Sequence, residues 1–258
     1  MQGYVLIAIG TKYIDEAHLL AQTIRRQDDK RPINVIIKKE DLHYAIDKDI
    51  FTDITIFEPV NEFYNYCNEG FERYGTYPKI NLYHYTRFEE NIFLDTDVLC
   101  QYSPDTLWDY LSNREQDVTM LGVKNDPSWH WGTINEVSNA FGKHVPHVHG
   151  GFLYFRKSAK YFFDYCNEIA YRYDELKCKR FYRGGMCDEI IFALAHSHFN
   201  YMPVEFDEKP IMTFNYNLMV DLPSKLQTHN NTTLDDYIPF VHMYDRTNFI
   251  PLFLKIMK

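Results

Sequence analysis

Two carboxylates, Asp95 and Asp97, directly follow the apolar run Ile92-Phe93-Leu94. An unbroken apolar run of this kind is typical of a strand that is buried on both faces of a sheet. In an open α/β sheet, ligands bind outside the carboxyl ends of the strands, where these two side chains would project. Carboxylates bind hard divalent cations, and a cation held there could neutralise a departing diphosphate. The alternative is a plain strand end followed by a capping aspartate.

The same spacing occurs a second time, in Asp47-Lys48-Asp49. No apolar run precedes this copy, and the residues around it are polar. We therefore expect a solvated helix face or turn there, and only the copy at Asp95 is a candidate metal site.

The first turn of the predicted sheet reads Gly10-Thr11-Lys12-Tyr13. It contains neither Gly-x-Gly-x-x-Gly nor Gly-Lys-Ser/Thr, which argues against a dinucleotide-dependent dehydrogenase and a P-loop enzyme. Thr11 and Tyr13 could hydrogen-bond to a base and stack on it. Equally, Thr11 could cap a helix and Tyr13 could pack under a loop.

The stretch from Lys79 to Phe88 predicts a helix that leads into the strand before Asp95. The residues that share one face at helical spacing are Ile80, Tyr83, His84 and Arg87. Lys79, at the start of this helix, could face a phosphate, because helix N-termini and lysines favour anions. The alternative is an exposed lysine in a first turn.

Two further stretches could contribute to a ligand site. Gly150 and Gly151 precede an apolar segment, where glycines either permit close approach of a ligand or form a tight turn. Asp188 and Glu189 occupy the first turn of a predicted helix. The helix dipole alone would favour acids there, and one of them could also bind a sugar hydroxyl.

A polar and aromatic loop is predicted from Lys124 to about Pro146, and it contains Trp129 and Trp131. Loops of this length are commonly functional, so we expect an acceptor site or a lid. Three nearby histidines could suggest zinc, but no fourth ligand is evident and backbone hydrogen bonding is the favoured interpretation. These histidines are His144, His147 and His149.

The elements that must position these residues alternate between strands and helices. Strands are predicted at 4–9, 34–37, 54–57, 118–123, 201–206 and 240–244, and helices at 14–27, 104–112 and 248–257. The early β-α-β order indicates a parallel sheet with right-handed crossovers. No repeat or linker divides the 258 residues, so a single domain is expected.

Composition restricts the class of protein. The 27 basic and 36 acidic residues give a net charge of −9, which makes generic nucleic-acid binding an unfavourable interpretation. Five scattered cysteines without a Cys-x-x-Cys pair favour a reducing, cytoplasmic location, with a bacterial or a phage-infected host cell as candidates. No apolar run reaches the ~20 residues of a membrane span.

Taken together, these stretches resemble the glycogenin and lipopolysaccharide galactosyltransferase family. Leu94 to Asp97 is similar to the family's Leu-Asp-x-Asp, and the Lys79 stretch to its upstream helix. His149 to Leu153 is similar to its Asn-Ser/Ala-Gly-Val strand, with histidine replacing asparagine. Asp188-Glu189 resembles its Asp-Gln pair, with glutamate replacing glutamine, and His242 resembles its late metal-binding histidine. The family's His-x-x-Gly-x-x-Lys-Pro-Trp ending is absent.

The resemblance implies a GT-A (Rossmann-like) α/β fold, with a mixed, mostly parallel central sheet flanked by helices. It implies one domain spanning residues 1–258, with a nucleotide-binding half over about 1–100 and an acceptor-binding half over about 101–258. The implied activity is that of a metal-dependent, hexosyltransferase-like enzyme. Such an enzyme moves a sugar from a UDP-linked donor to a hydroxyl group, with retention of configuration.

The resemblance also assigns roles to residues. Asp95, Asp97 and His242 would bind Mn²⁺ or Mg²⁺, with Asp95 also near the donor ribose. Asp188 would hold the donor sugar or the acceptor, and with inversion either Asp188 or Glu189 would deprotonate the acceptor. The other expected donor-binding residues are Thr11, Tyr13, Lys79, Arg87, Gly150, Gly151 and Arg246.

Two other classes of protein remain open at this point. One is a metal-dependent nucleotidyltransferase or phosphohydrolase, and the other is a catalytically inactive module that binds nucleotide sugars. The sequence does not choose among a glycan, lipopolysaccharide, a protein and a modified nucleotide as the acceptor.

Overall fold

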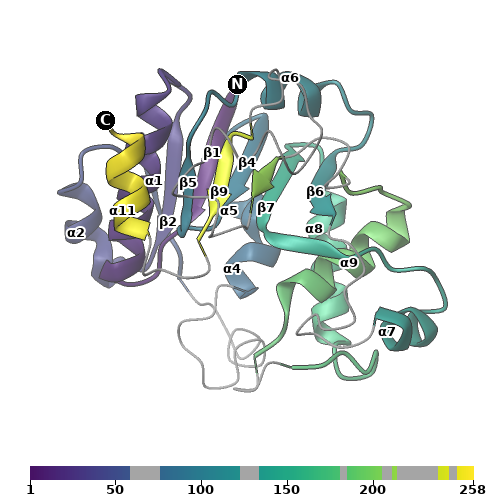
Figure 1. The fold of residues 1–258 in the computed structure, drawn as a ribbon. Coiled ribbons are helices and arrows are strands. Elements are labelled where there is room, and N and C mark those ends of the chain that lie inside the picture. The colour runs from purple at the N-terminus through teal and green to yellow at the C-terminus, as the bar shows by residue number, and fades with distance from the viewer. Residues whose placement is uncertain (59–75, 123–133, 181–184, 205–210, 214–237, 244–248) are drawn as a thin grey trace.

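The structure, a computed structural model, describes residues 1–58, 76–122, 134–180, 185–204, 211–213, 238–243 and 249–258. A six-stranded sheet in the order β3-β2-β1-β4-β7-β6 lies at its centre (Figure 1). Its strands are β1 (Gln2–Ile7), β2 (Ile33–Ile37), β3 (Asp53–Ile56), β4 (Glu90–Leu94), β6 (Val118–Gly122) and β7 (Val148–Arg156).

The pairing in this sheet is mixed and mostly parallel, as expected. Strands β3, β2, β1 and β4 are parallel neighbours, whereas β7 is antiparallel to both β4 and β6. The chain leaves β1 through helix α1 (Thr11–Arg26) toward β2, and β4 lies on the other side of β1. The strand order therefore reverses between β1 and β4, which is where ligands bind in open α/β sheets.

A second, three-stranded sheet has the order β5-β9-β8. Its strands are β5 (Val98–Cys100), β8 (Met212–Thr213) and β9 (Phe240–His242). Strand β5 follows β4 after three residues and pairs antiparallel with β9, so that Val98 lies opposite His242. This pairing brings the late histidine next to the carboxylates that end β4.

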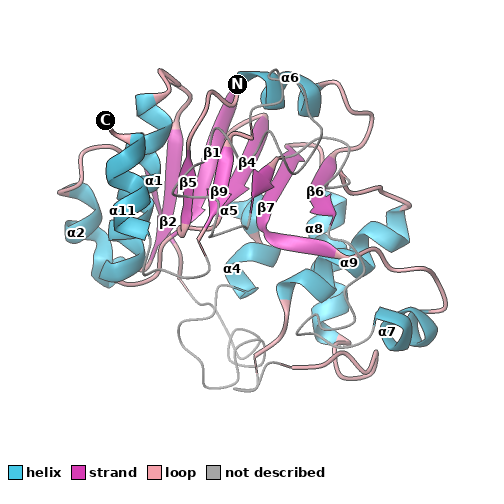
Figure 2. Ribbon diagram, in the orientation of Figure 1, coloured by secondary structure: helices cyan, strands magenta, loops and turns pink. Residues whose placement is uncertain are grey.

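Helices cover both faces of the central sheet (Figure 2). They are α1, α2 (Leu42–Ile46), α4 (Thr76–Ile80), α5 (Leu82–Tyr85), α6 (Asp105–Ser112), α7 (Ile134–Phe141), α8 (Lys160–Tyr171), α9 (Asp188–Phe199) and α11 (Phe249–Ile256). A short 3₁₀ helix covers Lys39–Asp41. None of the helices in the described residues has the length and apolar character needed to cross a bilayer.

The core has two layers because side chains alternate across each strand. Val5 and Phe93 pack into the layer that α8 and α9 cover. Leu6 and Leu94 pack into the layer that α1 covers. The apolar run before Asp95 is therefore buried on both faces, as its sequence predicts.

The structure corrects three expectations about elements. The predicted helix over 79–88 is two short helices that end at Tyr85, because Thr86 has extended backbone angles. The predicted strand over 201–206 is reduced, within the described residues, to a single bridge between Val204 and Leu121. The predicted loop over 124–146 contains helix α7, whose Val137 is buried in the core. Its tryptophans, Trp129 and Trp131, lie outside the described residues.

Candidate active site

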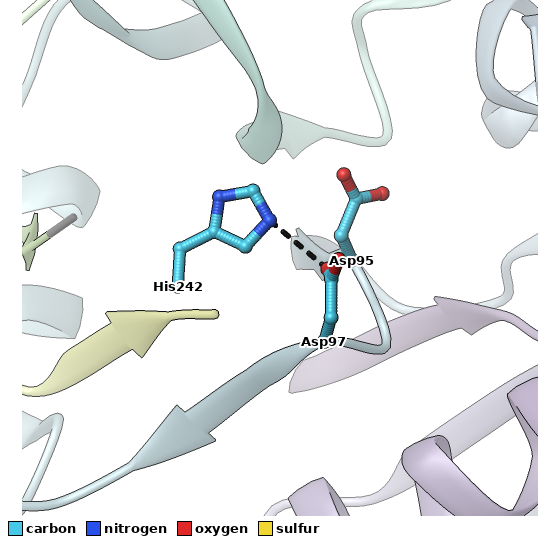
Figure 3. Close-up of side chains that lie close together, drawn as sticks. All are labelled: Asp95, Asp97 and His242. Atoms are coloured by element: carbon cyan, nitrogen blue, oxygen red, sulfur yellow. Dashed lines mark hydrogen bonds and ion pairs between the residues drawn. The ribbon is translucent and has the colours of Figure 1, made fainter. Parts of the chain in front are cut away.

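Asp95, Asp97 and His242 converge at the carboxyl end of β4 (Figure 3). One ligand atom from each residue can be chosen so that the three lie within 4.8 Å of one another. His242 Nε2 lies 3.0 Å from Asp97 Oδ1, and the histidine is only 3% exposed. Two carboxylate oxygens and one imidazole nitrogen suit a divalent cation such as Mn²⁺ or Mg²⁺, so the residues present fit the expected metal.

Backbone pairing of distant segments fixes this cluster. The Met243 N–H donates to the Asp97 carbonyl, next to the pairing of β5 with β9. On the other side, the Asp95 N–H donates to the Gly151 carbonyl of β7. The two carboxylates therefore lie on a turn that is tied to strands from two later parts of the chain.

Lys79 lies beside this turn, with its ammonium group between two carboxylates. Its Nζ is 2.9 Å from Asp95 Oδ1 and 3.0 Å from Asp188 Oδ2, and it donates to the Gly150 carbonyl at 3.3 Å. An ammonium group has three N–H bonds, so these three partners use its donor capacity. Lys79 thus joins α4, the turn after β4, strand β7 and the start of α9.

The two glycines lie inside β7 rather than in a turn before it. Pairing with β6 shifts register there, since Met120 is opposite Leu153 and Leu121 is opposite His149. The resulting bulge allows the start of α9 to approach, because a Cβ on Gly150 would lie 2.7 Å from Asp188 Oδ2. The Gly150 N–H donates to Glu189 Oε1 at 2.9 Å.

Burial and neighbouring charge shift three pKa values in this cluster. Burial, together with the Asp188 carboxylate, raises the pKa of Glu189 to about 8. Burial also raises the pKa of Asp95, and the Asp97 charge adds to this rise while Lys79 opposes it. Burial alone would lower the pKa of Lys79, but the charges of Asp188 and Asp95 outweigh burial and raise it. Lys79 is therefore charged and Glu189 is neutral at neutral pH.

One buried acid near the site, Glu16, was not predicted from the sequence. Glu16 of α1 accepts a hydrogen bond at 3.1 Å from the hydroxyl of Thr96, the residue between the two aspartates. Both side chains are buried. The sequence held a signal, since Glu16 lies four residues before the buried Leu20 and therefore on the same side of the helix.

Two of the other residues predicted to bind the donor, Thr11 and Tyr13, follow strand β1. Thr11 is the exposed first residue of α1, and Gly10, not Thr11, is its N-cap. Tyr13 is half-buried two residues further on and donates its backbone N–H to the Gly10 carbonyl. Both follow β1 at the sheet edge that carries Asp95, because β1 and β4 are parallel neighbours.

Arg87 does not belong to this cluster, which corrects the expectation for this residue. It precedes β4, and its 82% exposed side chain lies 4.0 Å from Asp53, the first residue of β3. This is the amino edge of the sheet, opposite the edge that carries Asp95. The helical spacing that grouped Arg87 with Ile80, Tyr83 and His84 does not apply, because α5 ends at Tyr85. Arg246 lies outside the described residues.

The alternative sites from the sequence analysis are also placed. Asp47 and Asp49 are exposed in the turn after α2, as expected for the second Asp-x-Asp. His144 is exposed, while His147 and His149 are buried at the start of β7. Among the described residues, the cluster of possible metal ligands contains Asp95, Asp97 and His242 and none of these three histidines.

Comparison with known proteins agrees with this architecture. Residues 1–125 match the mannosyltransferase family model. No curated protein sequence is significantly similar to the chain.

Solved structures with this fold include several glycosyltransferases. Mouse xyloside xylosyltransferase 1 has a TM-score of 0.60 at 9% identity, covering 96% of this chain and 99% of its own. The galactosyltransferase LgtC, in complex with donor and acceptor sugar analogues, has a TM-score of 0.62 at 15% identity, covering 100% and 97%. An active-site mutant of LgtC with glutamate in place of glutamine has a TM-score of 0.63 at 15% identity, covering 98% and 95%.

At these identities the structural likeness establishes the fold, and the family model adds the class of enzyme. By its fold and by the family model that its first 125 residues match, the chain is a glycosyltransferase of the GT-A fold.

Proposed function

We propose that this glycosyltransferase is metal-dependent and moves a sugar from a UDP-linked donor to a hydroxyl group of an acceptor. The observation that carries the proposal is the convergence of Asp95, Asp97 and His242 at the carboxyl end of β4. These residues would hold Mn²⁺ or Mg²⁺. When bound, the cation would supply charge neutralisation for the departing diphosphate.

The residues around this cluster support the proposal that a nucleotide binds next to it. The turn after β1, with Thr11 and Tyr13, lies at the same sheet edge as Asp95, because Leu6 and Leu94 are in register. Gly150 and Gly151 lie on the other side of Asp95, next to Asp188 and His242. We assign the base to the turn after β1 and the donor sugar to the bulge of β7.

The acids at the start of α9 divide into two roles. Asp188, which pairs with Lys79, would hold a hydroxyl group of the donor sugar or of the acceptor. Retention of configuration, which we propose, requires little general-base chemistry. With inversion, Asp188 would accept the acceptor proton, because Glu189 with a pKa of about 8 keeps its own proton at neutral pH.

The acceptor classes that we propose are a glycan, lipopolysaccharide, a protein and a modified nucleotide. We propose a reducing cytoplasm as the compartment, and the free, buried thiols of Cys100, Cys166, Cys178 and Cys187 support this location.

Thermal unfolding with ligands tests the proposed function. The melting temperature would be measured with UDP, GDP, CDP and ADP and with their sugar conjugates, each with and without Mn²⁺. A ligand that binds the folded state raises the melting temperature by mass action. We expect UDP and a UDP-sugar to stabilise the protein only when Mn²⁺ is present. Stabilisation by another nucleotide would replace UDP as the donor base, and no shift with any of them would refute the metal-dependent site.

The substitution Asp97→Asn tests the metal ligand directly. We expect sugar transfer to fall by at least about 100-fold, because a bound cation supplies several kcal/mol of charge stabilisation. The melting temperature without metal should stay close to that of the wild type, while the shift caused by Mn²⁺ should disappear. Asp49→Asn in the exposed second Asp-x-Asp is the matched control and should change neither quantity. An active Asp97→Asn enzyme would contradict the assignment.

A further inference from the structure

The ring of His149 packs against the ring of His242. The two ring centroids are 5.0 Å apart and the ring planes meet at 71°, an edge-to-face arrangement. Both residues are buried, with 2% and 3% of their surface exposed. The edge-to-face contact limits rotation of the His242 ring on the side that His149 occupies.

Gly151 provides the space in which the two rings meet. A Cβ at this position would lie 2.7 Å from His149 Cε1 and 3.3 Å from His242 Cε1. The Gly151 N–H also donates to His149 Nδ1 at 3.0 Å. This hydrogen bond ties the His149 ring to the backbone two residues on and so fixes the orientation of the ring.

The segment from His149 to Gly151 contacts both sides of the candidate metal site. The Gly151 carbonyl accepts the Asp95 N–H at 3.2 Å, while the His149 ring touches His242, whose Nε2 lies 3.0 Å from Asp97. The orientation of His242 and the position of Asp95 are therefore set by neighbouring atoms of one β-bulge.

We propose that His149, held by Gly151, is a positioning residue that keeps the His242 ring oriented for binding a divalent cation. This inference rests on the proposed metal site. Groups that orient a metal ligand from outside the coordination sphere typically change metal affinity by 10–100-fold when removed.

The variant His149→Asn removes the ring but keeps an acceptor for the Gly151 N–H. The asparagine side-chain oxygen can accept the N–H two residues on, as His149 Nδ1 does, but it brings no ring against His242. We expect this variant to preserve the bulge and the melting temperature without metal, and to weaken Mn²⁺ binding by about 10-fold. Mn²⁺ affinity would be measured without nucleotide, by the electron paramagnetic resonance signal of free Mn²⁺.

His198→Asn is the matched control, because His198 lies at the far end of α9 and stacks on Tyr165. It should bind Mn²⁺ as tightly as the wild type. A second variant, His149→Phe, keeps a ring against His242 and removes the acceptor for Gly151. We expect its Mn²⁺ affinity to lie closer to the wild type than that of His149→Asn.

The results of these measurements test the inference about His149 and the proposed metal site separately. Equal Mn²⁺ affinity in the wild type and His149→Asn would overturn the inference and leave the metal site intact. A His149→Phe variant that folds and binds Mn²⁺ as weakly as His149→Asn would also overturn it, because ring contact would then not be the cause. A wild-type protein that binds no Mn²⁺ would refute the proposed metal site itself.

Discussion

Four carboxyl groups lie close together around the turn after β4, and keeping all four ionised there would cost free energy. Asp95 and Asp188 share the ammonium group of Lys79. Asp97 lies against His242. Glu189 instead carries a raised pKa, so at the scale of single residues the cluster relieves its charge by keeping a proton on one acid.

This proton predicts how stability depends on pH. Glu189 has an ordinary pKa of 4.5 and a folded-state pKa of about 8, so between these values the folded protein holds a proton that the unfolded chain releases. The contribution of this group therefore makes the free energy of unfolding fall as pH rises through that window, by at most about 1.4 kcal/mol per pH unit. Chemical denaturation between pH 5 and 8 should show a weaker pH dependence in Glu189→Gln than in the wild type. Identical slopes would show that Glu189 titrates normally.

At the site, side-chain contacts hold short helices and strands together. Helix α4 has five residues, yet its Lys79 contacts the turn after β4, the bulge of β7 and the start of α9. Gly150 lets α9 come this close, since any side chain there would collide with Asp188. At the scale of elements, one lysine and one glycine therefore contribute to where the start of α9 lies, together with the burial of its apolar residues in the core.

Replacing Lys79 should expose this dependence. Lys79→Met leaves Asp95 and Asp188 without their shared cation, and breaking a buried ion pair of this kind costs about 3 kcal/mol. We expect the free energy of unfolding at neutral pH to fall by about that amount, as measured by urea denaturation without metal. Lys157→Met removes an exposed pair with Glu89 and should cost less than about 1 kcal/mol. Equal losses in the two variants would show that the contacts of Lys79 do not hold these elements.

The whole molecule is built on one sheet that joins early and late parts of the chain. The family model matches residues 1–125, but β4 and β6 both pair with β7, which lies beyond that stretch. The candidate metal site also needs His242 from β9. The predicted nucleotide-binding half therefore depends on strands from the predicted acceptor-binding half.

A fragment of residues 1–125 should accordingly fail to fold. Without β7, the apolar edge of β4 is unpaired and β6 has no neighbour in the sheet. We expect the fragment to lack a cooperative thermal transition by circular dichroism, and Mn²⁺ to have no effect on it. The full chain under the same conditions is the control, and a cooperative transition in the fragment would show that its strands suffice.

Much of the fold was readable from local patterns. The apolar runs that became β1, β2 and β4 are buried on both faces, and the helix predicted over 14–27 is found as α1. One prediction that failed, the helix over 79–88, depended on where an element ends. The helical spacing past Lys79 continues through Arg87, whereas α5 ends at Tyr85 because Thr86 has extended backbone angles.

The sequence by itself determined the pair Asp95 and Asp97 at the end of a buried strand, because apolar pattern and strand end are local properties. Only the tertiary structure decided what surrounds this pair. His242 reaches Asp97 across 145 positions of sequence, through the pairing of β5 with β9. His149 reaches His242 through a bulge that no local pattern predicts. Such contacts depend on which strands pair across the whole sheet, and pairing is set by the packing of the complete chain.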